Sequence, residues 1–271
     1  MTKKALLVGL NRYPDPDNTL RGCLNDVRQI SELLSTRFGF MADDAIRLLT
    51  DARATTRAIV RRLHWLVDGA RPGDVLVFHY SGHGAQVRDR HGDELDDGLD
   101  EIICPYDLNW DDPFTDDDLF AIVKDLPAGV NLTVILDCCH SGTGLREAAG
   151  AERRIRCLCP PLDIAYRRKA DMAVRRFGVR AAGCGAILIA GCRADQTSAD
   201  AYIDGGYHGA LTYCLCQALR DLGYAGTYRD LIERARRLLK EGGFEQVPQL
   251  EGPAPLLRRD VFSPQVEMAV S

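Results

Sequence analysis

The amino-acid sequence predicts an α/β fold, with a mostly parallel central sheet and helices on both faces. Short apolar runs bounded by turn residues, such as Asp74–Tyr80 and Asn131–Asp137, are typical of strands that are buried on both faces. These runs alternate with segments whose apolar residues recur at helical spacing, which favours parallel strands joined by helices. With 271 residues and 46% hydrophobic residues, the chain is long enough for one large or two modest domains.

The predicted elements of the first half follow in order. Four elements precede the central strand: a first strand, a helix that ends near Gly39, a second strand, and a helix capped by Thr50 or Asp51. Their ranges are Lys4–Leu10, Leu24–Phe38, Ala45–Leu49, a helix reaching Val67, and Asp74–Tyr80.

An acidic segment follows, and the regular pattern then resumes. Asp89–Glu101 contains acids at positions 89, 93, 94, 96, 97, 100 and 101, so we expect an exposed loop rather than packed core. The sequence TDDDLF (Thr115–Phe120) resembles a capped helix start. The remaining predicted elements are the strands Asn131–Asp137 and Gly185–Ala190 and the helices Tyr207–Leu222 and Thr227–Leu239.

Arg146–Arg180 has the opposite charge. It holds ten Lys or Arg residues against four acids, a local charge of +6 in a chain whose net charge is −5. Because it shows no sustained periodicity and contains Pro160–Pro161, we expect a linker or insertion. The chain therefore divides into residues 1–145, a basic linker over 146–182, and residues 183–271.

Composition excludes several classes of function. The net charge of −5 gives no reason to expect nucleic acid or an anionic membrane as a partner. The ten cysteines show no secreted framework, and the apolar run near the N-terminus is too short for a signal peptide. No stretch is apolar enough to span a bilayer. We therefore expect a cytoplasmic protein.

Reactive side chains follow two of the predicted strands. Cys139 lies just beyond Asn131–Asp137, where its thiol is expected to be exposed, and His83 stands between two glycines beyond Asp74–Tyr80. The carboxyl ends of parallel strands meet at one edge of a sheet, so these two side chains should lie close together. A thiol and an imidazole are the minimum apparatus of a cysteine nucleophile with its base.

Several motifs resemble the metacaspases, including their bacterial relatives. The resemblance rests on GCLNDV (Gly22–Val27), HYSGHG (His79–Gly84), TDDDLF, DCCHSG (Asp137–Gly142), GCRADQTSAD (Gly191–Asp200) and GALTY (Gly209–Tyr213), and covers nearly the whole chain. Position 83 precedes position 139 by 56 residues, in the order and near the separation that caspases show. The resemblance implies a single caspase-like domain, with 1–145 as the large-subunit region and 183–271 as the small-subunit region.

The same resemblance assigns site residues. It implies that Cys139 is the nucleophile, that His83 is its partner, and that the backbone N–H groups of Gly84 and Cys139 form an oxyanion hole. Cys138 is expected to point into the sheet. A basic substrate side chain would be bound by Cys23, Asp26, Ser81 and Asp137. The implied function is a monomeric cysteine endopeptidase that cuts proteins or peptides after Arg or Lys, with no required cofactor.

Two further expectations concern regulation. The basic linker is a candidate for self-cleavage at Arg153–Arg154, Arg167–Arg168, Arg175–Arg176 or Arg180; the alternative is an ordered, solvated face. Calcium-activated metacaspases bind the ion through acids that match Asp100, Asp116 and Asp117. Where a further acid is expected, this chain has Arg146, followed by Glu147, so we expect a weakened calcium site.

Three alternatives remain open from the sequence. The chain could be a non-catalytic caspase-like adaptor, because fold does not imply function. The sequence CHSGTGLR faintly resembles a tyrosine-phosphatase loop, although its arginine comes one residue late. The pairs Cys157/Cys159 and Cys214/Cys216 could bind a metal, but neither has the usual spacing.

Overall fold

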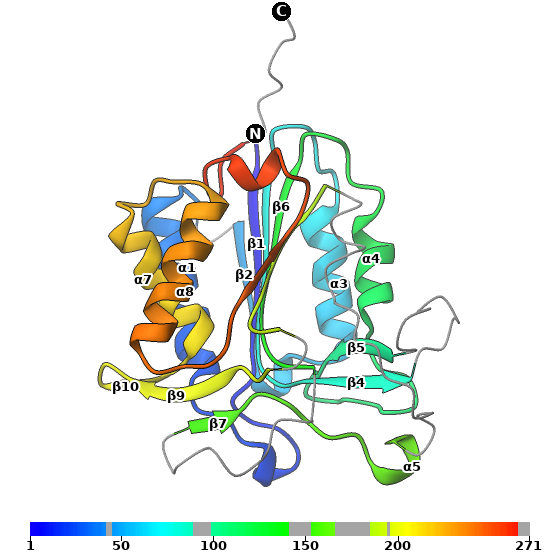
Figure 1. Cartoon of the computed structure of the whole chain (residues 1–271). Helices are drawn as coiled ribbons and strands as arrows, with labels where there is room; N and C mark the ends of the chain where they lie inside the picture. The colour runs from blue at the N-terminus through cyan, green and yellow to red at the C-terminus, as the bar shows by residue number, and fades with distance from the viewer. Residues whose placement is uncertain (42–44, 89–98, 141–152, 166–184, 194–195, 265–271) are drawn as a thin grey trace, which may run out of the picture.

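A computed structural model describes residues 1–41, 45–88, 99–140, 153–165, 185–193 and 196–264 (Figure 1). Its centre is a six-stranded sheet in the order β11-β8-β6-β3-β1-β2, in which β11 alone runs antiparallel to its neighbour. The strands are β1 (Lys3–Gly9), β2 (Ile46–Thr50), β3 (Val75–Ser81), β6 (Asn131–Asp137), β8 (Ile187–Ala190) and β11 (Gln249–Glu251). The predicted α/β fold with a mostly parallel sheet is confirmed.

Helices cover both faces of this sheet, as predicted (Figure 1). One face packs against α1 (Cys23–Arg37), α7 (Ala210–Asp221) and α8 (Tyr228–Glu241), and the other against α3 (Thr56–Val67) and α4 (Asp116–Val123). Side chains of β1 alternate between two core clusters, Ala5 and Leu7 on the α1 side and Leu6 and Val8 on the α3 side. This alternation explains why the central strands must be apolar at every position.

Two small sheets lie beyond the carboxyl ends of the parallel strands, at the bottom of Figure 1. The first pairs β4 (Gly84–Arg88) with β5 (Leu99–Ile103), and the second has the order β10-β9-β7. The second sheet consists of β7 (Arg153–Ile155), β9 (Ala199–Ile203) and β10 (Gly206–Gly209). Short helical turns complete the described chain: η1 (Pro16–Asn18), η2 (Asp51–Arg53), α5 (Leu162–Ala165) and η3 (Leu256–Arg258).

Several sequence predictions were wrong in detail. Asp100 and Glu101 belong to β5 and are only 1% and 5% exposed, so this end of the acidic segment is not a solvated loop. Thr55, rather than Thr50 or Asp51, caps α3, because residues 51–53 form a separate turn first. Residues 206–209 pair with β9 as a strand, so the helix predicted to start at Tyr207 begins only at Ala210.

The basic linker is also more ordered than predicted, because residues 153–155 pair with β9. Residues 146–152 and 166–184 lie outside the described part of the chain, and with them the self-cleavage candidates 167–168, 175–176 and 180. The described cysteines are all free thiols. No helix in the described ranges is both long and apolar enough to cross a membrane.

Candidate active site

The site is built where α1 begins and where β3 and β6 end. Ser81 and Asp137 are the last residues of β3 and β6 and pair with each other in register. The first turn of α1 brings Cys23 and Asp26 to the same edge. All four side chains are completely buried. The structure therefore gathers the four residues that the sequence suggested for binding a basic side chain.

A basic side chain of this same chain lies among them. The guanidinium of Arg156, which follows β7, is fully buried and donates hydrogen bonds to Asp26 (2.9 Å) and Asp200 (3.0 Å) through Nη2. Its Nη1 donates to the Ser81 hydroxyl at 2.7 Å and lies 3.3 Å from the Asp137 carboxylate. We call the pocket formed by Cys23, Asp26, Ser81, Asp137 and Asp200 the Arg156 pocket.

The carboxylates are held in place by donors other than Arg156. Backbone N–H groups of Arg21 and Gly22 each donate to Asp200 at 2.8 Å, and Gly209 N donates to Asp26 at 3.0 Å. Asp137 accepts bonds from Thr212 N (2.9 Å), Thr212 Oγ1 (2.8 Å) and Ser198 Oγ (2.7 Å). These donors orient the carboxylates around the guanidinium.

Two glycines from the sequence motifs lie against the buried charges of this pocket. A Cβ on Gly209 would overlap the Asp137 carboxylate and the Arg156 guanidinium, and a Cβ on Gly22 would come within 2.6 Å of Asp200 Oδ1. Only glycine lets the backbone approach the buried charges this closely. GCLNDV and GALTY therefore contribute backbone as well as side chains to the site.

Burial and charge oppose each other in the pocket. Burial disfavours the Asp26 carboxylate, but Arg156, His208 and Ser81 outweigh that effect and leave the pKa of Asp26 below its usual value. For Asp137 burial prevails and raises the pKa. Burial alone would lower the pKa of Arg156, yet the surrounding acids raise it, so the guanidinium stays charged. Burial also raises the pKa of the Cys23 thiol, which is neutral.

The backbone around Arg156 is bound like an added strand. Its N–H donates to Ser198 O at 3.1 Å, which continues the antiparallel pairing of β7 with β9. Its carbonyl oxygen accepts two hydrogen bonds of 3.1 Å, from Gly84 N and Cys139 N. The Arg156 carbonyl therefore lies between the two N–H groups that the sequence suggested for an oxyanion hole.

Cys139 is fully buried, contrary to the expected exposed thiol. The segment that carries Arg156 covers it, a contact that could not be inferred from strand ends alone. Its Sγ is hydrogen-bonded to the backbone of Ser198, as donor to the carbonyl at 3.5 Å and as acceptor from the N–H. Burial, followed by the neighbouring Cys192, raises the pKa of Cys139, so the thiol is protonated in this arrangement.

The two ring nitrogens of His83 have different surroundings. Nε2 lies 2.8 Å from the carbonyl of Asn18, and because a carbonyl can only accept, Nε2 carries the proton. Nδ1 is then the basic nitrogen; it is buried and has no hydrogen-bond partner among the described residues. Burial lowers the pKa of His83 to about 4, so the ring is neutral near pH 7. The Tyr13 hydroxyl accepts from His83 N at 2.8 Å and fixes the loop.

Cys138 points away from this edge. It belongs to the core cluster on the α3 side, and its Sγ lies 3.7 Å from His140 Nε2. Burial raises the pKa of this thiol. The expected position of Cys138, buried in the core beside Cys139, is confirmed.

The acids suggested for calcium lie near one another in the fold. Asp100 is buried in β5, Asp116 and Asp117 form the first turn of α4, and Ile102 bridges to Thr115 between these elements. Thr115 and Asp118 form a capping box, which confirms the capped helix start predicted for this sequence. Within the described ranges, no group of three or more His, Cys, Asp or Glu residues is placed to hold a metal ion. Arg146 and Glu147 lie outside those ranges.

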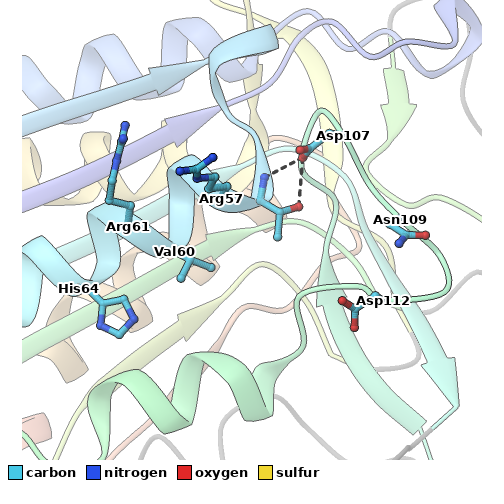
Figure 2. A pocket seen from close by; sticks show the side chains of 8 residues that line it. Arg57, Val60, Arg61, His64, Asp107, Asn109 and Asp112 are labelled. Atoms are coloured by element: carbon cyan, nitrogen blue, oxygen red, sulfur yellow. Dashed lines mark hydrogen bonds between the residues drawn. The ribbon is translucent and has the colours of Figure 1, made fainter.

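A second hollow lies between α3 and the loop after β5 (Figure 2). Its volume is about 680 Å³, and its lining mixes charges of both signs. Asp107 accepts bonds from Thr56 N (2.7 Å) and Thr56 Oγ1 (3.1 Å), which Figure 2 marks with dashed lines. None of its lining residues belongs to the Arg156 pocket or lies beside Cys139.

Two members of the site were not found from the sequence. Asp200 ends the quoted motif GCRADQTSAD, so a signal was present, but nothing in the spacing showed that β9 carries it to Asp26. Arg156 was one of ten basic residues in the linker. Its distinguishing feature is burial between three acids that are distant in sequence, which only the folded chain reveals.

Comparisons with known proteins point in one direction. A family model described as "Metacaspase, peptidase C14 domain" matches residues 3–147. Metacaspase-1 of Meyerozyma guilliermondii is 37% identical over 93% of this chain and 70% of its own length. Metacaspase-1 of Pyricularia oryzae is 36% identical over 96% of this chain and 74% of its own.

Solved structures agree with this similarity. A protein of Geobacter sulfurreducens superposes with a TM-score of 0.71 and 27% identity, over 98% of this chain and 100% of its own. Caspase-1 of Spodoptera frugiperda has a TM-score of 0.60 at 13% identity, over 98% of this chain and 91% of its own. The second likeness bears on the fold alone, which is caspase-like.

Proposed function

This chain belongs to the metacaspase family of cysteine endopeptidases, and we propose that it cuts protein substrates after Arg or Lys with Cys139 as nucleophile and His83 as base. The observation that carries the proposal is the seating of Arg156. Its side chain lies among three carboxylates while its carbonyl lies between two N–H donors beside Cys139. A substrate residue about to be cleaved needs both contacts at once.

The proposed chemistry follows from the two ring nitrogens of His83. Nδ1 takes the proton of the Cys139 thiol, which first has to leave its bonds to Ser198. The thiolate then attacks the carbonyl carbon, and the N–H groups of Gly84 and Cys139 stabilise the oxyanion. The imidazolium returns the proton to the leaving amine, and water hydrolyses the acyl-enzyme. The Asn18 carbonyl keeps Nε2 protonated and so holds the ring in the required tautomer.

Charge supports the choice of Arg or Lys. Three buried carboxylates attract a cation strongly, since charge-assisted hydrogen bonds are the strongest kind that side chains form. An Asp in the same position would add a fourth buried negative charge with no cation beside it. We therefore expect the enzyme to reject substrates with Asp before the cleaved bond.

The test uses peptides that differ only at the residue before the cleaved bond. Peptides with Arg or Lys at this position should be hydrolysed, and peptides with citrulline or Asp should not. Citrulline keeps the shape of arginine without its charge. Asp26→Asn should lower kcat/KM for the Arg peptide by about 100-fold, on the scale of a buried charge pair losing one partner. Efficient cleavage after Asp or citrulline by the wild type would contradict the proposal.

We also propose that the chain processes itself between Arg156 and Cys157. The pairing of β7 with β9 presents this bond to the site in the manner of a substrate strand. Of the sites expected from the sequence, Arg153–Arg154 lies in the same segment but two to three residues before the bound carbonyl of Arg156. We further propose that the protein is a monomer, which light scattering of the purified chain can check.

Calcium is the remaining part of the proposal. We retain the expectation of a weak site near Asp100, Asp116 and Asp117, with activation, where it occurs, in the range of loosely binding modules, about 10⁻⁴ to 10⁻³ M. The site chemistry described above uses no metal ion.

A further inference from the structure

We propose that this peptidase has a second specificity site, formed by Phe244 and the Gly243 carbonyl, which selects arginine four residues before the cleaved bond. The inference rests on the proposed function, because it takes Arg156 as the residue before that bond. It adds a second criterion to the substrate class: arginine both directly before the cleaved bond and at the fourth residue before it.

The contact that carries the proposal is made by Arg153. Its guanidinium carbon lies 4.6 Å from the centroid of the Phe244 ring, and its Nη1 donates to Gly243 O at 3.1 Å. A guanidinium over an aromatic face is attracted by the negative charge of the ring face. The carbonyl adds a directed hydrogen bond, so the two groups recognise both the plane and the charge of the side chain.

Both groups are fixed by the protein rather than by Arg153. Phe244 is half-buried against the cluster of Ala210, Cys214 and Leu239, and its N–H donates to Leu239 O at 2.9 Å. Gly243 has a φ of 71°, a conformation that glycine adopts without strain. The turn lies at the C-terminal end of α8, where the helix dipole adds partial negative charge and favours a cation.

The register explains why the fourth residue reaches this place. β7 pairs antiparallel with β9, with Arg153 opposite Ala201 and Ile155 opposite Ala199. Side chains along a strand alternate between faces, so Arg153 and Arg156 cannot share one face. Arg156 enters the acidic pocket, and Arg153 lies on the other side, over Phe244. Any substrate bound in this register places its fourth residue there.

The neighbouring position offers a contrast within the same strand. Arg154 donates to the Thr19 carbonyl at 2.5 Å, with its side chain exposed. An aromatic face together with a carbonyl should discriminate more strongly than a single carbonyl. We therefore expect arginine to matter more at the fourth position than at the third.

The test measures kcat/KM for the fluorogenic peptides Arg-Arg-Ile-Arg, Ala-Arg-Ile-Arg and citrulline-Arg-Ile-Arg with full-length enzyme. The chain's own segment competes equally with all three, so it does not affect their ratios. We expect the first peptide to be better than the second by about 3- to 10-fold, on the scale of an exposed cation–π contact with one charged hydrogen bond. The citrulline peptide should lie near the alanine peptide.

The variant Phe244→Leu keeps the apolar packing and removes the ring face. It should bring the ratio of the first two peptides to about 2 or less, because the cation–π contribution is gone. Hydrolysis of Ala-Arg-Ile-Arg should be unchanged, which also shows that the variant is folded. Equal rates for the two peptides with the wild type, or an undiminished ratio in Phe244→Leu, would overturn the second site while leaving cleavage after arginine intact. If no peptide ending in arginine is cut, the proposed function fails, and this inference fails with it.

Discussion

Replacing Arg156 by alanine tests how the buried charges are balanced. The change is best made in a Cys139→Ala chain, so that no cleavage alters the sample. It leaves three buried carboxylates without their shared cation, and removing one partner of a buried ion pair typically costs 3–5 kcal/mol. Arg156 and its partners are at most 1% exposed, so no reduction for solvent screening applies.

We expect a loss near the lower end of that range, about 3 kcal/mol, because water can enter the pocket once the covering segment loosens. For a domain of this size, such a loss lowers Tm by roughly 6–12 °C. Urea denaturation of the two chains at pH 7.5 measures the difference directly. Arg154→Ala in the same background is the matched control, since it shortens an exposed arginine two residues away and should cost less than about 1 kcal/mol.

The same pair of chains provides a binding readout. A labelled peptide ending in arginine should bind the Cys139→Ala, Arg156→Ala chain and should compete poorly with the intact segment in Cys139→Ala alone, because a tethered residue has a high effective concentration. The reasoning is refuted if Arg156→Ala destabilises no more than Arg154→Ala and leaves peptide binding unchanged. That outcome would mean that the guanidinium does not occupy the acidic pocket in solution.

Three further predictions concern catalysis, calcium and pH. Cys139→Ala and His83→Ala should each abolish peptide hydrolysis, with non-additive losses, while Cys138→Ala should keep the rate and lose only stability; an active Cys139→Ala chain would refute the assignment. Activity titrated with calcium after chelation should rise only at submillimolar to millimolar concentrations, and a micromolar response lost in Asp117→Ala would show a tight site instead. Burial lowers the pKa values of His79, His83 and His140 from 6.5 to about 4. Between these two pKa values the unfolded state therefore binds more protons than the folded state. The free energy of unfolding should have its full value above pH 6.5 and fall towards pH 4, by up to about 3 kcal/mol for each histidine. Denaturation midpoints that are equal at pH 7.5 and pH 4.5 would contradict this.

The central sheet was predictable because its strands are buried on both faces. Apolar runs such as 75–80 and 131–137 cannot be placed in any other environment, and the helices between them carry one apolar face each. The edge elements were harder. β7 has the sequence RRI, and its place in a sheet comes from backbone pairing with β9, which leaves no periodicity in its side chains.

Burial of charge was the least predictable feature. Asp100 and Glu101 lie at the end of an acidic run, and composition alone favours exposure, yet β5 buries both. Arg156 looks like any linker arginine until Asp26, Asp137 and Asp200 are brought together. These acids lie 19, 44 and 130 positions from Arg156 along the chain, and no local pattern encodes such a cluster.

The central claim, that Cys139 cuts the chain after Arg156, is tested most directly by the terminal residues of the fragments that form on incubation. Purified wild type and Cys139→Ala are incubated side by side, with and without calcium, and examined by intact mass and N-terminal sequencing. The account predicts a wild-type fragment that begins at Cys157 and another that ends at Arg156, with Cys139→Ala remaining whole. Cleavage confined to other basic residues, or the same cut in Cys139→Ala, would contradict it.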